Sequence, residues 1–336
     1  MKKIIIIGGG VAGMEAARCL NEMGFETALI EKESRLGGHV AQWHHLFPTL
    51  QPANEIVRLL RASTQDSSVI LGKSVESLAR EGNFFKAQLS DGRVIPGNAV
   101  LITTGFQLFN ARRKEEYGFG IYDNVITSAN FEELLNSGGP LVTPKGKIPE
   151  KVAFIHCVGS RDEKVGNRYC SRVCCITAVK QAIEIKEKLP ACQPFCFYMD
   201  LRMFGLEYEQ LYLDAQAKHG VTFIRGRLSE AAEDINGNLV IKAEDTLMGK
   251  PLKMTVDLLV LMVGMEANDQ DTLIKSIPLT TGKERFIQPL NGFTLNNYTE
   301  QEGVFVAGTC SGPKNIPETL ADVRGACLAI REYLSK

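Results

Sequence analysis

The sequence carries little net charge and lacks a long hydrophobic run, and both absences exclude classes of function. Its 38 Lys and Arg residues nearly balance its 39 Asp and Glu residues, which leaves a formal net charge of −1 over 336 residues. That balance does not predict a surface for nucleic acid or for an anionic membrane. The apolar run from Ile4 to Ile7 is too short for a signal sequence or a membrane span. We therefore expect a cytoplasmic globular protein with two domains.

A C-x-x-C dithiol is also missing, although the chain has nine cysteines. Cytoplasmic thiols stay reduced, so this number points towards metal or redox chemistry and away from a disulfide framework. Four of the cysteines lie within nineteen residues, as Cys157-x12-Cys170-x3-Cys174-Cys175. Four thiolates suit Zn²⁺ or an iron–sulfur cluster. Because the paired C-x2-C knuckles of zinc ribbons are absent, the pattern favours a [4Fe–4S] cluster over zinc or uncommitted thiols.

The strongest motif that is present opens the chain. KKIIIIGGGVAGMEAARCLNEMGFETALIEKE reads as strand, tight turn, helix, turn and strand, with Gly8, Gly10 and Gly13 at G-x-G-x-x-G spacing. In such a unit the glycines allow the turn, the approach of a pyrophosphate and close packing of helix on strand. Glu31 follows the second strand, where a carboxylate accepts hydrogen bonds from ribose hydroxyls. The motif predicts a dinucleotide site, and the alternative is a glycine-rich turn before a core helix.

Three further stretches resemble FAD-binding oxidoreductases. Gly37 and Gly38 in KESRLGGHVAQ resemble their second glycine pair, AVLITTGF resembles their A-T-G turn, and GVFVAGTCSG resembles their C-terminal signature. Thr309 stands where that signature usually has Asp. The strand around Val75 is expected to meet the adenine, with an ordinary sheet edge as the alternative. The candidate FAD-binding residues are Gly8, Gly10, Ala12, Gly13, Glu31, Lys32, Gly37, Gly38, His39, Val75, Thr103, Thr104, Gly105, Gly308, Thr309 and Ile316.

A second glycine fingerprint is missing from the middle of the chain. In reductases that bind two dinucleotides, the central segment opens with its own strand and G-x-G-x-x-G. Here the strand KVAFIHCVGS is followed by RDEKVGNRYCSRVCC. The segment therefore predicts a Rossmann-type domain whose phosphate loop is replaced by cysteines, and it argues against NAD(P)H binding there.

FIHCVGSRDEKVGNRYCSRVCCITAVKQA resembles the flavin-containing, iron–sulfur A subunit of heterodisulfide reductase. GGHVAQWHHLFPTL, YGFGIYDNVITSANFEELL and GTCSGPKNIPETLADVRGA resemble the same family, so the likeness covers most of the chain. It implies that Cys157, Cys170, Cys174 and Cys175 hold a [4Fe–4S] cluster next to the FAD. It also implies B- and C-type partner subunits, electron-carrier proteins and a homodimeric core.

The departures from that family are as specific as the matches. Ferredoxin-like C-x2-C-x2-C-x3-C insertions are absent, and the chain reads FPTLQPANE where the family commonly reads F-P-T-L-D-C-S. The chain therefore most resembles the short A subunits of heterodisulfide reductase-like complexes of sulfur oxidisers.

One lysine between the motifs has a functional and an ordinary interpretation. Lys180 matches the C-C-x4-K of the family, which implies a catalytic cation near the flavin, where it would stabilise reduced, anionic flavin. The ordinary alternative is a solvated surface lysine. His44 and His45 are interpreted as plain loop residues.

The expected fold is α/β, with a discontinuous FAD domain (1–108 and 290–336) and an inserted Rossmann-like domain carrying the cluster (109–289). The favoured function is electron transfer between FAD, the [4Fe–4S] cluster and partner subunits in sulfur or thiol redox metabolism. A stand-alone NAD(P)H-dependent flavin disulfide reductase and a non-catalytic iron–sulfur redox sensor are the alternatives.

Overall fold

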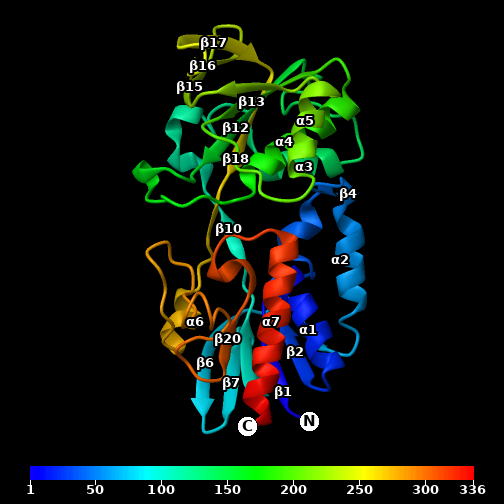
Figure 1. Ribbon diagram of the computed structural model, residues 1–336, viewed down its shortest axis with the longest axis vertical. Coiled ribbons are helices and arrows are strands. Elements are labelled where there is room, and N and C mark those ends of the chain that lie inside the picture. Colours follow the sequence, from blue (N-terminus) through cyan, green and yellow to red (C-terminus); the bar gives the residue numbers. More distant parts are fainter. The chain divides into compact units, whose positions relative to one another are not determined.

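Two parallel sheets organise residues 1–336 of the computed structural model, one sheet in each of two units (Figure 1). Unit 1 consists of Met1–Ala41, Ala53–Gln107 and Glu266–Lys336, and unit 2 consists of Gln42–Pro52 and Leu108–Met265. Compared with the boundaries expected from the sequence, two segments change units, and one boundary moves by a single residue, from 108 to 107. Residues 266–289 lie in unit 1, and the excursion, as we call Gln42–Pro52, lies in unit 2.

The sheet of unit 1 has five parallel strands in the order β20-β9-β1-β2-β5. Its strands are β1 (Lys3–Ile7), β2 (Glu26–Ile30), β5 (Ser68–Ile70), β9 (Ala99–Ile102) and β20 (Val304–Val306). The central strand β1 is apolar throughout its middle because both of its faces are buried. The helices α1 (Val11–Glu22) and α7 (Ile316–Ser335) pack side by side and share one apolar core with this sheet (Figure 1).

The remaining elements of unit 1 surround this sheet. They are α2 (Ala53–Ala62), α6 (Asp271–Ser276), the 3-10 turn η5 (Gly308–Ser311) and the antiparallel strands β6 (Val75–Glu81), β7 (Phe84–Leu89) and β8 (Val94–Gly97). In β7 the burial alternates from residue to residue, as expected for a sheet with one face on the core. A 3-10 turn, η1 (Gly38–Gln42), leads into the excursion.

Unit 2 repeats this plan with a parallel sheet in the order β11-β18-β12-β13-β14. Its strands are β11 (Val125–Thr127), β12 (Lys151–Val158), β13 (Gln193–Tyr198), β14 (Thr222–Arg225) and β18 (Leu258–Val263). Its helices are α3 (Ser128–Asn136), α4 (Cys174–Lys188) and α5 (Tyr208–Ala217). An antiparallel sheet is formed by β15 (Leu228–Glu233), β16 (Leu239–Asp245) and β17 (Lys250–Val256).

Short elements complete the chain. The excursion contains the two-residue strands β3 (His45–Leu46) and β4 (Gln51–Pro52), and β10 (Phe106–Leu108) pairs with β19 (Met265–Ala267). The 3-10 turns η2 (Ala111–Arg113), η3 (Glu115–Tyr117) and η4 (Glu163–Val165) belong to unit 2. The α/β class with two parallel sheets is thus confirmed. None of the helices combines the length and apolarity that crossing a bilayer requires.

Candidate functional site

The glycine turn between β1 and α1 is built by close contact between backbones. A Cβ atom on Gly13 would lie 1.8 Å from the carbonyl oxygen of Gly8, so only glycine fits where the helix meets the turn. Gly10 is different, because a Cβ atom placed on it would have no protein atom within 4 Å. Gly13 is therefore required by the fold itself, whereas the space in front of Gly10 is open to a ligand.

The N-terminus of α1 leaves its backbone donors without a side-chain cap. Gly10 is the N-cap residue, and no side chain hydrogen-bonds to the first turn. The helices α3 and α7, by contrast, begin with complete capping boxes, formed by Thr127 with Asn130 and by Asn315 with Glu318. Uncapped amides and the positive end of the helix dipole are what a pyrophosphate needs. The turn and the helix together fit the dinucleotide expected from the sequence.

Glu31 is held beside this turn by two backbone amides. Its Oε2 atom accepts a hydrogen bond from the Gly9 amide at 2.6 Å, and its Oε1 atom accepts one from the Glu33 amide at 2.8 Å. The side chain is almost completely buried. Each carboxylate oxygen has a second lone pair, so the fixed carboxylate can still accept from ribose hydroxyls.

The turn after β9 fixes the opposite side of the glycine loop. Thr103 Oγ1 donates to the carbonyl oxygens of Ile7 at 3.1 Å and Gly8 at 2.9 Å. Thr104 Oγ1 donates to Gln270 Oε1 at 2.8 Å. The Nε2 atom of Gln270 is buried without a hydrogen-bond partner. Sequence analysis missed Gln270, because only the fold brings α6 to this turn.

His39 has one defined proton position in the structure. Its ring stacks on Phe106 with centroids 4.3 Å apart, and its Nε2 atom lies 2.9 Å from the Phe106 carbonyl oxygen. A carbonyl can only accept, so Nε2 carries the proton and Nδ1 is free to accept. Burial lowers the pKa of His39, which favours this neutral form.

Gly308 begins η5, and its amide is held by a residue that sequence analysis missed. The Gly308 amide donates to Asp322 Oδ2 at 2.9 Å, and Asn297 Nδ2 donates to Asp322 Oδ1 at 2.8 Å. Lys314 forms an ion pair with the same carboxylate at 3.4 Å. The carboxylate at this turn thus comes from α7, fourteen positions after Gly308, while Thr309 follows the glycine directly. No local spacing in the sequence signals that contact.

The other candidate FAD residues all lie in unit 1. Ala12 is buried in α1, Gly37 is buried, and Lys32 and Gly38 are exposed. Val75 begins β6 at the edge of its antiparallel sheet, a Cβ atom on Gly105 would lie 3.8 Å from Thr309 Oγ1, and Ile316 is the first residue of α7.

The cysteine cluster lies where β12 ends and α4 begins. The pairing of β12 with β18 shifts register between Ile155 and Val158, and Cys157 in this bulge has a φ of 59°. Bulges of this kind redirect a side chain at the end of a strand. Cys174 and Cys175 open α4. The structure thus brings together three buried cysteines, Cys157, Cys174 and Cys175.

Cys174 is within hydrogen-bonding reach of both of the other buried sulfurs. This contact, followed by the Arg161 charge, holds the pKa of Cys157 below its usual range against the effect of burial. The same contact from Cys174 and the neighbouring His156 ring lower the pKa of Cys175 to about 4. The hydrogen bonds and charges of its two neighbours raise the pKa of Cys174. Cysteine sulfurs are ligands that suit iron or zinc, and Cys174 contacts both of the other two sulfurs.

Cys170 differs from the other three cysteines. It is only partly buried, and its Sγ atom accepts a hydrogen bond from the Arg172 amide at 3.3 Å. Sequence analysis also missed His156, whose buried ring nitrogens have no hydrogen-bond partner in good geometry although the ring lies beside Cys175.

The loop between β12 and α4 is anchored by a buried carboxylate. Asp162 Oδ2 accepts from Lys114 Nζ at 2.8 Å and from Arg227 at 2.6 Å. A small antiparallel bridge joins Asp162 to Asn167, and Ser160 Oγ accepts from the Ser171 amide at 3.0 Å. These bonds give the loop that carries Cys170 a fixed course.

Lys180 is buried on α4, so the surface alternative is wrong: only 2% of the residue is exposed. Its Nζ atom lies 2.5 Å from Glu132 Oε1, 3.1 Å from the His45 carbonyl oxygen and 3.2 Å from Glu184 Oε2. The contacts with Glu132 and the His45 carbonyl are hydrogen bonds, and the contact with Glu184 is an ion pair. The flavin role remains a prediction, and sequence analysis did not identify the two carboxylates as partners of this lysine.

Comparison with known proteins defines what this chain is similar to. Residues 2–141 match the family described as pyridine nucleotide-disulphide oxidoreductase. The chain is 32% identical to the A subunit of H(2)/formate:CoB-CoM heterodisulfide,ferredoxin reductase of Methanococcus maripaludis, over 100% of this chain and 64% of that protein. It is also 32% identical to the iron-sulfur A subunit of CoB–CoM heterodisulfide reductase of Methanocaldococcus jannaschii, over 98% of this chain and 64% of that protein. The chain thus spans less than two thirds of the length of these relatives.

Solved structures with the same fold include thioredoxin reductases. The enzyme of T. acidophilum has a TM-score of 0.71 at 17% identity and is covered completely, as is this chain. The enzyme of Lactococcus lactis has a TM-score of 0.70 at 15% identity, with 99% of it and 100% of this chain covered. At these identities the likeness concerns the fold. The resemblance to the A subunit of heterodisulfide reductase and the predicted fold class are both confirmed.

Proposed function

Because this chain is homologous along its length to the A subunit of heterodisulfide reductase and carries a pyridine nucleotide-disulphide oxidoreductase domain, we propose that it is an electron-transfer subunit with one FAD and one [4Fe–4S] cluster. An FAD-dependent oxidoreductase is the class of enzyme that both relationships support. When bound, the two groups supply one- and two-electron redox chemistry that side chains cannot. Gly8, Gly10, Gly13 and Glu31 would hold the FAD.

The observation that carries the proposal is the position of the cysteines in unit 2. In unit 1 the central strand β1 is followed by the glycine turn and α1, and in unit 2 the central strand β12 is followed by the cysteine loop and α4. Cysteines therefore stand where a second phosphate loop would stand. That substitution supports a cluster in place of a nicotinamide cofactor.

Substitution of one cluster ligand tests the proposal directly. We expect anaerobically prepared protein to contain about four irons per chain, the composition of the cluster. Cys174→Ser should lose most of this iron and keep its FAD, because the two sets of residues belong to separate units. Cys192→Ser is the matched control: Cys192 is also buried in unit 2, yet burial raises its pKa to about 11, and it should keep its iron. One zinc per chain without iron would contradict the cluster.

The source of electrons separates the proposal from its first alternative. A chain without a nicotinamide loop should be reduced by dithionite or a reduced ferredoxin and only poorly by NADH. Rapid stoichiometric reduction of the flavin by NADH would instead favour a stand-alone NAD(P)H-dependent disulfide reductase. A cluster that degrades in air and changes oligomerisation, with no turnover beside partner subunits, would favour a redox sensor.

The assembly is part of the same proposal. We infer B- and C-type partner subunits, electron-carrier proteins and a homodimeric core in the cytoplasm, with sulfur or thiol redox metabolism as the process served. The relatives are named as A subunits, which supports a complex of several subunits. Copurification from the native host, with the visible spectrum recorded, tests the partners, and recovery of the chain alone would contradict them.

A further inference from the structure

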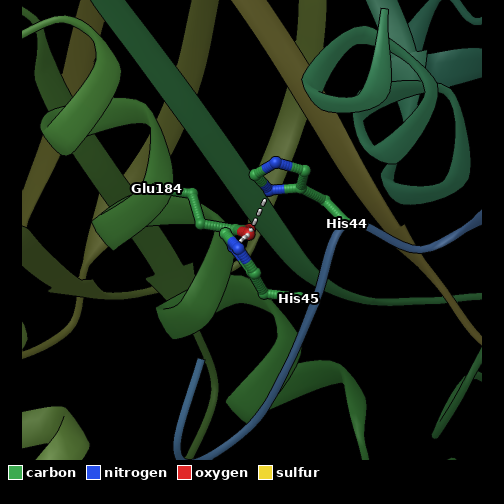
Figure 2. A group of neighbouring side chains, drawn as sticks. All are labelled: His44, His45 and Glu184. Atoms are coloured by element: carbon green, nitrogen blue, oxygen red, sulfur yellow. Dashed lines mark hydrogen bonds and ion pairs between the residues drawn. The ribbon is translucent and has the colours of Figure 1, made fainter. Parts of the chain in front are cut away.

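We propose that His44, His45 and Glu184 form a Zn²⁺ site in unit 2, separate from the cysteine cluster. The three side chains converge, with one ligand atom from each lying within 4.8 Å of the other two (Figure 2). His44 Nδ1 lies 2.9 Å and His45 Nδ1 lies 2.8 Å from the same Glu184 oxygen, Oε1. The inference rests on this geometry and not on electron transfer, but its test uses the FAD and iron of the proposed function.

The local backbone makes this convergence possible. Neighbouring residues in a strand point to opposite faces of the sheet. His44, however, lies in a bend immediately before β3, and His45 is the first residue of that short strand. The bend turns both rings towards α4, where their centroids are 3.9 Å apart with planes tilted by 58°. Figure 2 shows the two rings reaching the Glu184 carboxylate from the same side of the loop.

The net charge of the buried groups around Glu184 is negative, and this favours a bound cation. Glu132 and Glu184 are both buried, and Lys180 is the buried cation between them. Glu132 has further donors in the His44 amide and Gln181 Nε2. Glu184 Oε2 lies 3.2 Å from Lys180 but has no hydrogen bond in good geometry. With neutral imidazoles the group therefore carries one uncompensated negative charge, and a buried charge of this kind favours a bound cation or a proton.

The ligand types select the metal. Two imidazole nitrogens suit borderline metals such as zinc, whereas Mg²⁺ and Ca²⁺ prefer oxygen ligands throughout. Two histidines and one glutamate match a zinc site with an open fourth position. About a quarter of each histidine side chain is exposed, 23% and 26%, while the Glu184 side chain is 2% exposed. The open position therefore lies on the histidine side, which is accessible to solvent.

The site joins the excursion to the main body of unit 2. Without metal, the excursion is held by hydrogen bonds such as that from Asn136 to the Gln42 carbonyl oxygen at 2.7 Å and by the edge contact of Phe47 with Tyr208. A metal bound by His44, His45 and Glu184 would add a link from this segment to α4. Zinc should therefore protect the excursion from proteolysis.

The test uses the full chain with its flavin and iron in place, so that the cysteines are not available to zinc. After mild chelation, equilibrium dialysis should show one Zn²⁺ per chain. Co²⁺, used as the probe, should give ligand-field bands without thiolate-to-metal charge transfer. His45→Ala and, separately, His44→Ala should weaken binding by at least about tenfold. His219→Ala, which removes a histidine elsewhere in unit 2, should bind Zn²⁺ as the unaltered chain does.

The following outcomes would contradict the proposed zinc site. The absence of zinc binding by the unaltered chain, or binding by both histidine variants as tight as that of the unaltered chain, would leave only two histidines hydrogen-bonded to Glu184. Thiolate charge transfer that persists in His44→Ala and His45→Ala would assign the metal to cysteines. FAD and iron contents, measured on the same samples, show whether a variant has folded, and they should be unchanged.

Discussion

At the scale of single residues, substitutions of two glycines in the same turn should affect different properties, the stability of the fold and the binding of FAD. Gly13→Ala places a Cβ atom 1.8 Å from a backbone oxygen, so we expect it to lower the free energy of unfolding of the apoprotein by about 3 kcal/mol. Gly10→Val meets no protein atom near its Cβ but fills the space in front of α1. It should leave apoprotein stability nearly unchanged and abolish FAD binding. Denaturation of the apoproteins and flavin content measure the two effects, and stoichiometric FAD in Gly10→Val would contradict the site.

Asp162 provides a residue-scale prediction about pH. Burial opposes its ionisation, but the hydrogen bond from Lys114 and the charge of Arg227 outweigh burial and lower its pKa. A lowered carboxyl pKa contributes stability above the unfolded value, near 4, and this contribution is lost as pH falls through the folded value. Asp162→Asn should therefore cost about 3 kcal/mol at neutral pH, and the cost should shrink below about pH 4.

Chemical denaturation of Asp162→Asn at several pH values measures this effect. Asp214→Asn is the control, because Asp214 pairs with Lys218 on the surface of α5, and its replacement should change little. A cost that does not depend on pH would show that packing, and not charge, explains the role of Asp162.

Residue patterns were sufficient to predict features that depend on neighbours in sequence. The spacing of Gly8, Gly10 and Gly13 predicts the turn because backbone contact within one β-α unit dictates it. The burial of Lys180 could not be predicted, because it depends on Glu132 and His45, which lie far away in sequence. The contact of Asp322 with Gly308 could not be predicted either, because it depends on how η5 and α7 fold against each other. The burial of Glu132, which pairs with Lys180, is equally invisible to helix periodicity. Local spacing therefore predicts the loops, and tertiary packing decides the charges around them.

At the scale of elements, the helix α4 carries two separate sets of candidate functional residues. Its first turn supplies Cys174 and Cys175, and its middle supplies Lys180 and Glu184. The family resemblance implies that Lys180 assists the flavin. Its ion pairs with Glu132 and Glu184 indicate instead that it stabilises the folded protein. The two roles predict different effects of the same substitution, Lys180→Met.

Lys180→Met leaves two buried carboxylates without their cation. We expect it to lower the free energy of unfolding by about 3 kcal/mol, whereas Lys188→Met, at an exposed position of the same helix, should cost much less. If Lys180 also serves the flavin, the flavin midpoint potential should fall in Lys180→Met and stay constant in Lys188→Met. An unchanged potential together with the loss of stability would assign Lys180 a structural role alone.

At the scale of the whole molecule, two units with separate cores should respond to separate ligands. The candidate FAD residues lie in unit 1, and the four candidate cluster cysteines lie in unit 2. FAD at a hundred times its Kd should stabilise unit 1 by about 2.7 kcal/mol. In calorimetry of apoprotein, added FAD should raise one transition, and reconstitution with iron and sulfide should raise the other. One transition that both ligands shift equally would show that the units unfold together.

The discontinuity of unit 1 also constrains how the chain can fold as it is synthesised. The strand β20 pairs with β9, and α7 packs on α1, although about 200 residues or more separate the members of each pair. A ribosome releases β1, α1 and β9 long before β20 and α7, so the first sheet has an unpaired edge and an uncovered helix face during that interval. Unit 2, most of which is contiguous from Leu108 to Met265, can form meanwhile. Nascent chains arrested near residue 290 should therefore protect unit 2 from proteolysis while unit 1 remains open to cleavage, until the last strand closes it.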